Sequence, residues 1–421
     1  MRAALLVTGD EVLGGRVGER NAGFLARSLA SLGARVERTV IVGDSVTDVG
    51  GALRDLLATG VDLVCTTGGL GPTADDLTMA AVAAVTNRPL VLNGDALALV
   101  RARTRSVPPR PGVDEATLDR LARKQASLPA GSTVLPPIGT APGCALTHER
   151  TLIVVLPGPP SELETMWNGA IAAGPVADLL AAAPAARNRT FRLWAVWEAE
   201  IVDHLETLDA DDLATVGTYT REGELEIVVP DRLGPRVEGI LRAAFGDALF
   251  ATDERHVDSL VAEALLAGGG TLAVAESCTG GGLGARLTAI PGASAWFLGG
   301  AITYSDATKV ALLGVDPTLI AAHGAVSAEC AAAMATGART VTGATWALSI
   351  TGIAGPDGGS PDKPVGLVFI GLAGPDGVAT AEHRFRGNRE VIRHRSQTAA
   401  LHHLRTALTR ALADTPIGSQ A

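Results

Sequence analysis

The 421-residue chain is poor in aromatic side chains, which make up only 3% of its residues. A core of packed aromatic rings is therefore excluded, and the small and aliphatic residues that dominate favour helices packed closely on sheets. The four cysteines are scattered, and no two have the spacing C-x-x-C. This pattern indicates neither a zinc site nor a redox pair, and it fits a reducing compartment.

The chain also lacks long apolar runs and an excess of positive charge. No apolar run approaches the roughly 18 residues that a membrane span needs, and the first apolar run is too short for a signal peptide. The net charge is −10, with 45 acidic against 35 basic side chains, which disfavours binding to nucleic acid or to anionic membranes. We therefore expect a cytoplasmic protein with neither kind of partner.

Lysine is unusually rare. Lys124, Lys309 and Lys363 are the only three, and arginine supplies the remaining 32 basic side chains. Lysine differs from arginine because it can lose its proton when it is desolvated. One of the two tyrosines, Tyr304, stands five residues before Lys309 in A-I-T-Y-S-D-A-T-K-V-A-L-L-G. This proximity raises the question of a shared chemical role.

Strand-like and helix-like segments alternate along most of the chain, whose length predicts several domains. The alternation predicts an α/β protein with a doubly wound, mainly parallel sheet in the N-terminal domain. A small α/β connecting subdomain follows, and a second alternating run predicts a C-terminal α/β sandwich domain. The expected ranges are 1–170, 171–252 and 253–415, with a disordered tail at 416–421.

The stretch A-E-S-C-T-G-G, residues 275–281, places hydroxyl and thiol groups where a strand ends and glycines open a helix. Ligands of open α/β sheets bind at such strand ends, and free N–H groups at a helix N-terminus stabilise an oxyanion or a phosphate. Ser277 is therefore a candidate nucleophile. Adjacent Cys278 is an alternative, although burial as a small apolar residue is the more common state of a thiol. An ordinary helix cap also explains these residues.

The segment with Tyr304 and Lys309 likewise follows a strand and opens a helix, with Ser305 as the expected cap. Apolar neighbours on that helix would partly desolvate Lys309, and a desolvated lysine can act as a base. The Tyr304 hydroxyl could relay a proton or hold the amine. A core tyrosine followed by an exposed helical lysine explains the pattern equally well.

A third strand end carries S-I-T-G-I-A-G-P-D-G-G, residues 349–359. Glycine-rich loops of this kind cradle phosphate or ribose through backbone N–H groups, but this loop matches neither the dinucleotide fingerprint nor the Walker loop. Arg386 and Arg389 could pair with a phosphate, and Arg386 is taken as a substrate-binding candidate. A surface turn and a solvated helix start are the alternatives.

Two N-terminal stretches also follow strands, at residues 9–21 and 65–78. The glycines of G-G-L-G-P-T suit a phosphate, and Asp75 and Asp76 could hold a divalent cation. Helix capping explains the two aspartates equally well, and Glu11 can be a simple turn residue. The candidate ligand-binding residues of this domain are Glu11, Gly68, Gly69, Gly71, Thr73, Asp75 and Asp76.

Taken together, the motifs resemble one known family. A-E-S-C-T-G-G, G-x-x-T-Y-S-x-x-x-K, H-G-A-V-S-x-E, T-G-I-A-G-P and F-x-G-x-R occur in order within residues 256–410. They resemble the C-terminal domain of the CinA (competence/damage-inducible protein A) family, which is related to nicotinamide-nucleotide amidohydrolases. The resemblance implies a hydrolase of pyridine-nucleotide salvage, which converts nicotinamide mononucleotide to nicotinic acid mononucleotide and ammonia without a metal.

The same resemblance implies roles for single residues. Ser277 would be the nucleophile, Lys309 the base and Tyr304 an assisting residue. An oxyanion and substrate loop is implied at Thr279, Gly280 and Gly281. Contacts to the nucleotide are implied at Thr351, Gly352 and Gly355.

The N-terminal part resembles the other domain of this family. The two strand-end stretches, with G-T-A-P-G at 139–143 and L-P-G-P-P-S-E-L at 156–163, are similar to molybdopterin-binding proteins of the MoaB/MogA type. This resemblance implies either hydrolysis of ADP-ribose with a divalent metal or simple binding of a nucleotide-like ligand. Residues 171–250 resemble the family's connecting subdomain.

Two functions of different class remain. The first is the amide hydrolase, and the second is a non-catalytic nucleotide-binding or competence-associated interaction protein. The presence of both Ser277 and Lys309 favours the first. In either case we expect nucleotide ligands and a homo-oligomer, specifically a dimer. The hydrolase requires that the Lys309 amine lie near the Ser277 hydroxyl, within hydrogen-bond reach or one water away.

Overall fold

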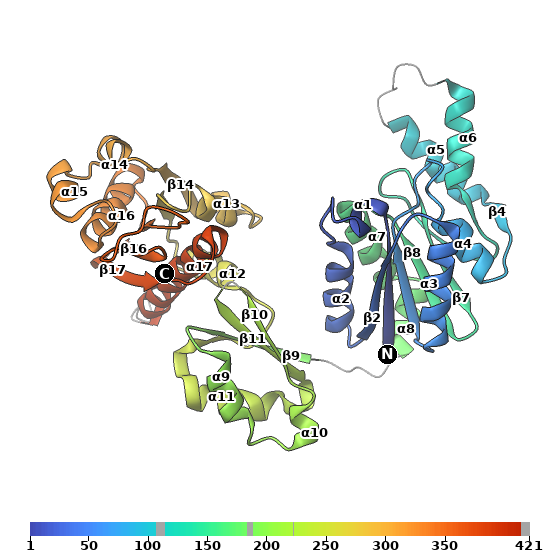
Figure 1. Ribbon diagram of the computed structural model, residues 1–421, viewed down its shortest axis with the longest axis horizontal. Helices are drawn as coiled ribbons and strands as arrows, with labels where there is room; N and C mark the ends of the chain where they lie inside the picture. The colour runs from blue at the N-terminus through green and yellow to red at the C-terminus, as the bar shows by residue number, and fades with distance from the viewer. Residues whose placement is uncertain (107–113, 183–187, 222, 414–421) are drawn as a thin grey trace, which may run out of the picture. The chain divides into compact units, whose positions relative to one another are not determined.

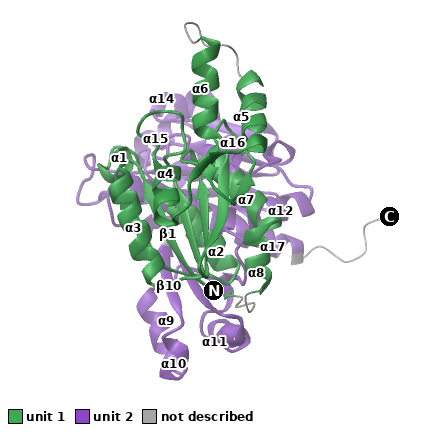
Figure 2. Ribbon diagram, turned by 90° about the vertical axis from the view of Figure 1, so that its right-hand side faces the viewer, with its two compact units in different colours: residues 1–188 green, residues 189–421 purple. Residues whose placement is uncertain are grey.

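The computed structural model describes residues 1–106, 114–182, 188–221 and 223–413 of the chain. The chain divides into two compact units, residues 1–188 and 189–421, which Figure 2 shows in different colours. The expected domain boundary at residue 170 lies inside helix α7 (Pro160–Ala172), and the first unit continues beyond it. The expected tail at 416–421 lies outside the described residues.

A six-stranded sheet with the order β2-β1-β3-β8-β7-β6 forms the centre of the first unit. β2, β1, β3 and β8 run parallel, whereas β7 and β6 add antiparallel pairs at one side. The doubly wound, mainly parallel sheet expected from the sequence is confirmed. The strands are β1 (Arg2–Thr8), β2 (Arg35–Val42), β3 (Leu63–Thr67), β6 (Thr133–Leu135), β7 (Gly143–His148) and β8 (Thr151–Leu156).

Helices cover both faces of this sheet (Figure 1). Successive side chains of a strand point to opposite faces, so Leu6 of β1 joins one buried cluster with α3 and α4, and Leu5 joins another with α2, α7 and α8. The remaining elements are α1 (Asp10–Leu13), α2 (Asn21–Ser31), α3 (Val46–Ala58), α4 (Thr78–Val85), α5 (Gly94–Ser106), α6 (Glu115–Gln125), α8 (Pro175–Ala182), and the paired β4 (Leu90–Leu92) and β5 (Ser127–Pro129).

The second unit begins with the connecting subdomain, a four-stranded sheet with the order β10-β11-β9-β12. Its helices pack on one apolar cluster that includes Phe191, Ile201 and Leu241. The elements are β9 (Asn188–Trp194), α9 (Glu198–Leu205), α10 (Ala210–Leu213), β10 (Gly217–Arg221), β11 (Glu224–Pro230), α11 (Gly234–Phe245) and β12 (Leu249–Ala251).

The rest of the second unit is a five-stranded sheet with the order β14-β13-β15-β16-β17. β14, β13 and β15 are parallel, and β16 and β17 continue the sheet in antiparallel fashion. The strands are β13 (Leu272–Glu276), β14 (Phe297–Ile302), β15 (Trp346–Gly352), β16 (Leu367–Gly374) and β17 (Gly377–Arg384). The helices are α12 (Val257–Ala267), α13 (Gly282–Thr288), α14 (Asp306–Leu313), α15 (Pro317–His323), α16 (Ala328–Thr342) and α17 (Arg389–Ala413).

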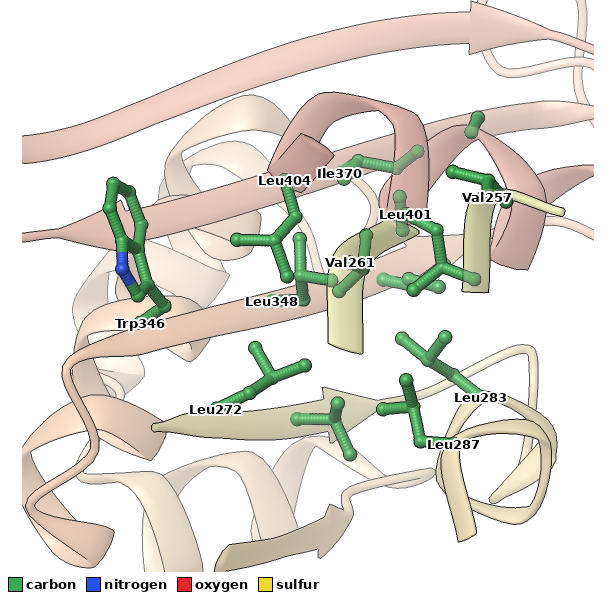
Figure 3. Packing of buried hydrophobic residues seen from close by; sticks show 14 of the residues in the cluster. Val257, Val261, Leu272, Leu283, Leu287, Trp346, Leu348, Ile370, Leu401 and Leu404 are labelled. Atoms are coloured by element: carbon green, nitrogen blue, oxygen red, sulfur yellow. The ribbon is translucent and has the colours of Figure 1, made fainter. Parts of the chain in front are cut away.

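Helices sandwich this sheet, as the sequence predicted. Leu272 of β13 belongs to the buried cluster that β13 forms with α12, α13 and α17 on one face of the sheet, together with Leu283 and Leu401 (Figure 3). The next residue along the strand, Ala273, faces α14 and α16, and its small side chain lets these helices approach the sheet closely. Both faces are thus buried, as parallel strands require. No helix within the described ranges is long and apolar enough to cross a membrane.

The connecting subdomain contacts α17 through a buried histidine cluster. His402 Nε2 lies 2.8 Å from Glu224 Oε1, and its ring stacks on Trp194 with 4.6 Å between ring centroids. The Nε2 atoms of His383 and His403 lie 2.8 Å apart. Burial lowers the pKa of all three histidines, that of His383 to about 4. The folded unit therefore keeps these rings neutral at pH values where an exposed histidine is charged.

We predict that the second unit loses stability as the pH falls from 7 to 5. Below the ordinary histidine pKa of 6.5, the unfolded chain binds protons that the folded cluster does not, so the free energy of unfolding decreases. Burial raises the pKa of Glu224, which offsets part of this effect by one proton at most. Urea unfolding at several pH values measures the slope.

The double variant His383→Gln/His403→Gln should reduce that slope by about half or more, because two of the three groups no longer titrate. His394, which is exposed on α17, supplies the matched control, and His394→Gln should keep the wild-type slope. An unchanged slope in the double variant would show that the cluster does not cause the pH dependence.

Candidate functional site

Three strand ends of the C-terminal sheet meet at one edge. β13 lies between β14 and β15, and all three are parallel, so their carboxyl ends lie side by side. Ser277 follows β13, Tyr304 and Lys309 follow β14, and Thr351 lies near the end of β15. The convergence expected from the sequence is therefore present, at the sheet edge where α/β proteins bind ligands.

The Lys309 amine lies at the predicted distance from Ser277. Nζ of Lys309 is 3.3 Å from Ser277 Oγ and donates a hydrogen bond of 2.9 Å to the carbonyl oxygen of Thr303. Lys309 is 1% exposed and Ser277 8%. Among the described residues no carboxylate lies within ion-pair distance of this amine. It is therefore buried with neutral partners only, which is costly for a charged group.

The local sequence explains how α14 presents this lysine. The Ser305 hydroxyl caps the helix by accepting from the N–H of Thr308 at 3.2 Å, as predicted from the sequence. Lys309 and Leu313 are its buried residues, and residues four apart lie on the same helix face. Leu313 packs in the apolar cluster beneath the sheet. Burial of Leu313 therefore turns Lys309 inward, toward the strand ends.

Glu276, the last residue of β13, fixes the loop that carries Ser277. Its carboxylate is 1% exposed and accepts from the N–H groups of Gly281, Leu283 and Gly284 at 3.1, 3.0 and 2.8 Å. A carboxylate at a helix N-terminus satisfies free N–H groups and complements the helix dipole. No role was predicted for Glu276, although an acid that closely precedes a glycine-opened helix is a recognisable signal for a helix cap.

This cap corrects part of the expected oxyanion loop. The N–H of Gly281 is taken by Glu276, and the N–H of Gly280 donates to the carbonyl oxygen of Ser277 at 3.0 Å. Neither amide is therefore free to bind an oxyanion. The N–H of Thr279 has no acceptor in the part of the chain that the structure describes. The buried Thr279 hydroxyl likewise lacks a partner there.

Tyr304 does not contact the two central side chains. It is 61% exposed, and its hydroxyl accepts from Nη2 of Arg389 at 3.1 Å. No hydrogen bond within the described ranges joins it to Ser277 or Lys309. The position that the sequence analysis gave the tyrosine, holding the amine, is taken by the Thr303 carbonyl. Tyr304 lies instead at the outer rim of the site.

Arginines of α17 form hydrogen bonds with the loop that follows β15 and with the loop that follows Ser277. Arg389 donates to the carbonyl oxygen of Gly355 at 2.7 Å as well as to Tyr304. Arg393, one turn later, donates to the carbonyl oxygen of Thr279 at 2.6 Å. Arg393 was missed by the sequence analysis, although its spacing of four residues from Arg389 puts both on one helix face.

The other predicted residues of this site have different surroundings. The Thr351 hydroxyl donates to the carbonyl oxygen of Ala325 at 2.7 Å, so it supports the fold. A side chain at Gly352 would meet Leu367 O at 2.7 Å, so glycine is required there for packing. Arg386 is exposed.

Cys278 is poorly suited as the nucleophile. Its side chain is buried at 5% exposure, and burial raises the pKa of its thiol to about 11. Since the thiolate is the reactive form of cysteine, very little of it is present near neutral pH. Ser277 is therefore the better candidate.

The N-terminal unit has a pocket of about 430 Å³ at the carboxyl ends of its parallel strands. Five of the predicted residues line it, so the two glycine-containing stretches lie side by side at this pocket. These residues are Glu11, Gly68, Gly69, Asp75 and Asp76. Residues that were not predicted also line the pocket, among them Thr8, Glu19, Arg20, Asn21, Asp44 and Gly158. Gly71 and Thr73 lie in the same loop but not in the pocket wall.

The two aspartates of the predicted metal site, Asp75 and Asp76, accept hydrogen bonds from their own loop. The Asp76 carboxylate accepts from the N–H groups of Gly71 and Thr73 at 2.7 and 2.8 Å, and Asp75 accepts from the Thr73 hydroxyl at 2.5 Å. Each Asp76 oxygen thus accepts a backbone hydrogen bond, which orients the carboxylate, and binding of a divalent cation by Asp75 and Asp76 stays a prediction. No group of three or more His, Cys, Asp or Glu side chains in the described ranges is placed to bind a metal ion.

These features define an α/β protein with two separate strand-end sites, an acidic pocket in one unit and a buried serine–lysine pair in the other. Sequence comparison agrees with this division. Residues 4–174 match the family model of the probable molybdopterin binding domain, and residues 254–408 match that of the CinA C-terminal domain. The chain belongs to the CinA-like protein family.

Full-length relatives support this assignment. A CinA-like protein of Mycolicibacterium vanbaalenii is 44% identical over 421 aligned residues, covering 97% of this chain and 99% of the relative. A CinA-like protein of Mycobacterium tuberculosis is 42% identical, covering 97% of each chain. A solved structure, the competence/damage inducible protein CihA from Agrobacterium tumefaciens, is 38% identical over 36% of this chain and 95% of its own, with a TM-score of 0.35. The assignment therefore rests on the sequence matches.

We predict that Glu276→Ala destabilises the C-terminal domain by about 3 kcal/mol, because one buried and two partly buried N–H groups lose their acceptor. Urea unfolding measures the loss. Glu329, an exposed acid in the first turn of α16, provides the control, and Glu329→Ala should stay within about 0.5 kcal/mol of wild type. Equal effects of the two substitutions would contradict the role assigned to Glu276.

Proposed function

We propose that the C-terminal domain hydrolyses the carboxamide of nicotinamide mononucleotide, giving nicotinic acid mononucleotide and ammonia in pyridine-nucleotide salvage. The observation that carries the proposal is the distance of 3.3 Å between Lys309 Nζ and Ser277 Oγ at a buried strand end. A serine is a weak nucleophile until a neighbouring group accepts its proton. Lys309 is the group that can do so here.

The surroundings of Lys309 suit this step. A neutral amine can donate to the Thr303 carbonyl and at the same time accept the proton of the Ser277 hydroxyl through its lone pair. The Thr303 carbonyl cannot donate, so it orients the amine without competing for that proton. In addition, no carboxylate among the described residues lies within ion-pair distance of Lys309 Nζ. These contacts support a role for Lys309 as the general base.

The reaction then follows in two steps. Ser277 Oγ attacks the carboxamide carbon while its proton passes to Lys309 Nζ, and Lys309 returns that proton to the leaving nitrogen as ammonia departs. The resulting ester on Ser277 is cleaved by a water molecule, whose proton passes through Lys309 back to Ser277 Oγ. The N–H groups of Cys278 and Thr279, for which no acceptor is found among the described residues, are the loop amides available to the developing oxyanion. Arg389, Arg393 and the exposed Tyr304 lie where they could bind the substrate.

We predict that Ser277→Ala lowers ammonia release from nicotinamide mononucleotide by about a thousandfold or more, because the nucleophile is removed. Ammonia is measured by a coupled assay with and without EDTA, and the wild-type rate should be unchanged by the chelator. A folded Ser277→Ala protein with near wild-type activity would contradict the proposal. Absence of ammonia release from the folded wild-type protein would favour the non-catalytic binding or interaction role.

Lys309 requires a separate test. Lys309→Met removes the base, and Lys309→Arg keeps a positive charge but cannot accept a proton at neutral pH. Both should lower kcat by about a hundredfold or more. Lys124→Met, in the other unit, is the matched control and should release ammonia at the wild-type rate. Full activity of Lys309→Arg would show that the residue supplies charge and not a base.

A second function is proposed for the N-terminal unit, which is the binding and hydrolysis of ADP-ribose. It is supported by the pocket that Glu11, Gly68 and Gly69 line at the strand ends. Because no group of three or more His, Cys, Asp or Glu side chains in the described ranges is placed to bind a metal ion, we derive no metal-dependent step from these residues, and dependence on a cation is left to the experiment.

We expect the wild-type protein to release AMP from ADP-ribose in the presence of Mg²⁺ or Mn²⁺. Glu11→Gln should lower that rate at least about tenfold, because an acidic group of the pocket wall loses its charge. Glu115, exposed in the first turn of α6, provides the control, and Glu115→Gln should not change the rate. If ADP-ribose is neither cleaved nor bound, the second function is wrong while the amide hydrolase stands.

A further inference from the structure

Lys363 lies in the loop that joins β15 to β16, residues 353–366, and takes no part in the reaction steps proposed above. The loop is closed at its base, where the N–H of Gly366 donates to the carbonyl oxygen of Ile353 at 2.7 Å. Ala354, 3% exposed, belongs to the buried apolar cluster between the sheet and α17. The loop is therefore a compact structure whose ends are fixed.

The amine of Lys363 connects this loop to the segment between α15 and α16. Its Nζ donates to the carbonyl oxygens of His323 and Val326 at 2.7 and 2.8 Å, and the side chain is half-buried. A hydrogen bond with a charged donor is stronger than one between neutral groups. Two such bonds from one amine hold the loop and the segment together.

A helix cap explains only the first of these two bonds. His323 is the last residue of α15, and a lysine often binds the free carbonyls at a helix C-terminus. Val326, however, lies beyond the end of that helix. The Thr351 hydroxyl, near the end of β15, donates to the carbonyl oxygen of Ala325 in the same segment at 2.7 Å. The segment after α15 is thus attached to β15 and to its loop by several bonds, and it gives the loop a fixed base to rest on.

The beginning of the loop contacts the Ser277 site through Arg389. The carbonyl oxygen of Gly355 accepts from Nη1 of Arg389 at 2.7 Å, and Nη2 of the same guanidinium donates to the Tyr304 hydroxyl at 3.1 Å. A planar guanidinium that has two fixed acceptors also has a fixed direction. The place of Gly355 therefore sets the direction of Arg389 at the rim of the site.

The nucleophile lies beside the start of the same loop. The N–H of Ser277 donates to the carbonyl oxygen of Ile350 at 2.9 Å, and Ile350 precedes the loop on β15. Lys309 lies on α14, which is not part of the loop. A shift of the loop would therefore move Gly355 and leave the serine–lysine pair in place.

We propose that Lys363 is a positioning residue of the amide hydrolase, which holds the loop 353–366 in place and so keeps the Arg389 guanidinium directed toward the substrate. The inference rests on the function proposed for the C-terminal domain. Without the two bonds of Lys363 the loop samples other positions, and only a fraction of the molecules has Arg389 in place. The apparent affinity for the substrate falls by that fraction, whereas the reaction of the bound substrate continues.

Steady-state kinetics of ammonia release by the full-length protein tests this inference, with nicotinamide mononucleotide as the substrate. We expect Lys363→Met to raise KM about tenfold and to lower kcat by less than about twofold, which is the pattern of lost substrate binding. A merely structural lysine would reduce the amount of folded enzyme and leave KM unchanged. An unchanged KM, or a loss of kcat at constant KM, would overturn the inference.

Arg339→Met is the matched control. Arg339 of α16 is half-buried like Lys363, and it also donates to a loop carbonyl, that of Thr345, at 3.1 Å. Thr345 directly precedes β15, so this bond lies at the end of the strand opposite to the site. Arg339→Met should therefore have the KM of the wild type.

A double variant tests whether Lys363 acts through Arg389. Arg389→Met alone should raise KM, and adding Lys363→Met should raise it further by less than about twofold, because the group that the loop orients is already absent. If the two effects on KM multiply, Lys363 acts independently of Arg389 and the inference is wrong.

A measurement on the wild-type protein keeps the test valid if Lys363→Met folds poorly. Hydrogen exchange of the peptide with residues 353–366 is followed by mass spectrometry, with and without nicotinic acid mononucleotide. The bound nucleotide should slow this exchange at least about threefold, because it selects the positioned loop. Unchanged exchange would overturn the inference. Absence of ammonia release from the wild type refutes the amide hydrolase, and slower exchange with nicotinamide mononucleotide would then retain the loop as part of a binding site.

Discussion

The C-terminal site depends on the two hydrogen bonds made by the buried amine of Lys309. Removing an amine from water is costly unless its hydrogen bonds are replaced, and here the Thr303 carbonyl and the Ser277 hydroxyl replace them. Both partners lie at the ends of parallel strands, so the order β14-β13-β15 brings them to the amine. Glu276 completes the arrangement, because its carboxylate holds the start of α13 and with it the loop of Ser277.

Besides the acid–base chemistry that lysine allows, the three lysines share a structural feature. All three lysines donate to backbone carbonyls of loops. Lys363 Nζ bonds to the carbonyl oxygens of His323 and Val326 at 2.7 and 2.8 Å, and Lys124 bonds to that of Thr73. Only Lys309 adds a side-chain hydroxyl, that of Ser277, to its partners, which distinguishes it from the other two.

Periodicity and turn residues predicted the alternating strands and helices, and with them the meeting of Ser277 and Lys309, because parallel strands must end at one edge. Periodicity and turn residues could not predict which hydrogen bonds form at that edge of the sheet. Glu276 accepts a hydrogen bond from the Gly281 N–H group, which the sequence pattern assigned to the substrate loop. The Tyr304 side chain is exposed, and its hydroxyl accepts from Arg389. Such choices depend on side-chain directions set by tertiary packing, which spacing along the chain does not contain.

The central claim is that Ser277 carries the acyl group during amide hydrolysis. Rapid acid quenching of the enzyme during turnover of nicotinamide mononucleotide, followed by peptide mass spectrometry, tests it most directly. The peptide with Ser277 should gain the mass of the substrate less ammonia, with the added group on the serine. The same group on Cys278, or steady ammonia release by Ser277→Ala without any such peptide, would contradict the account.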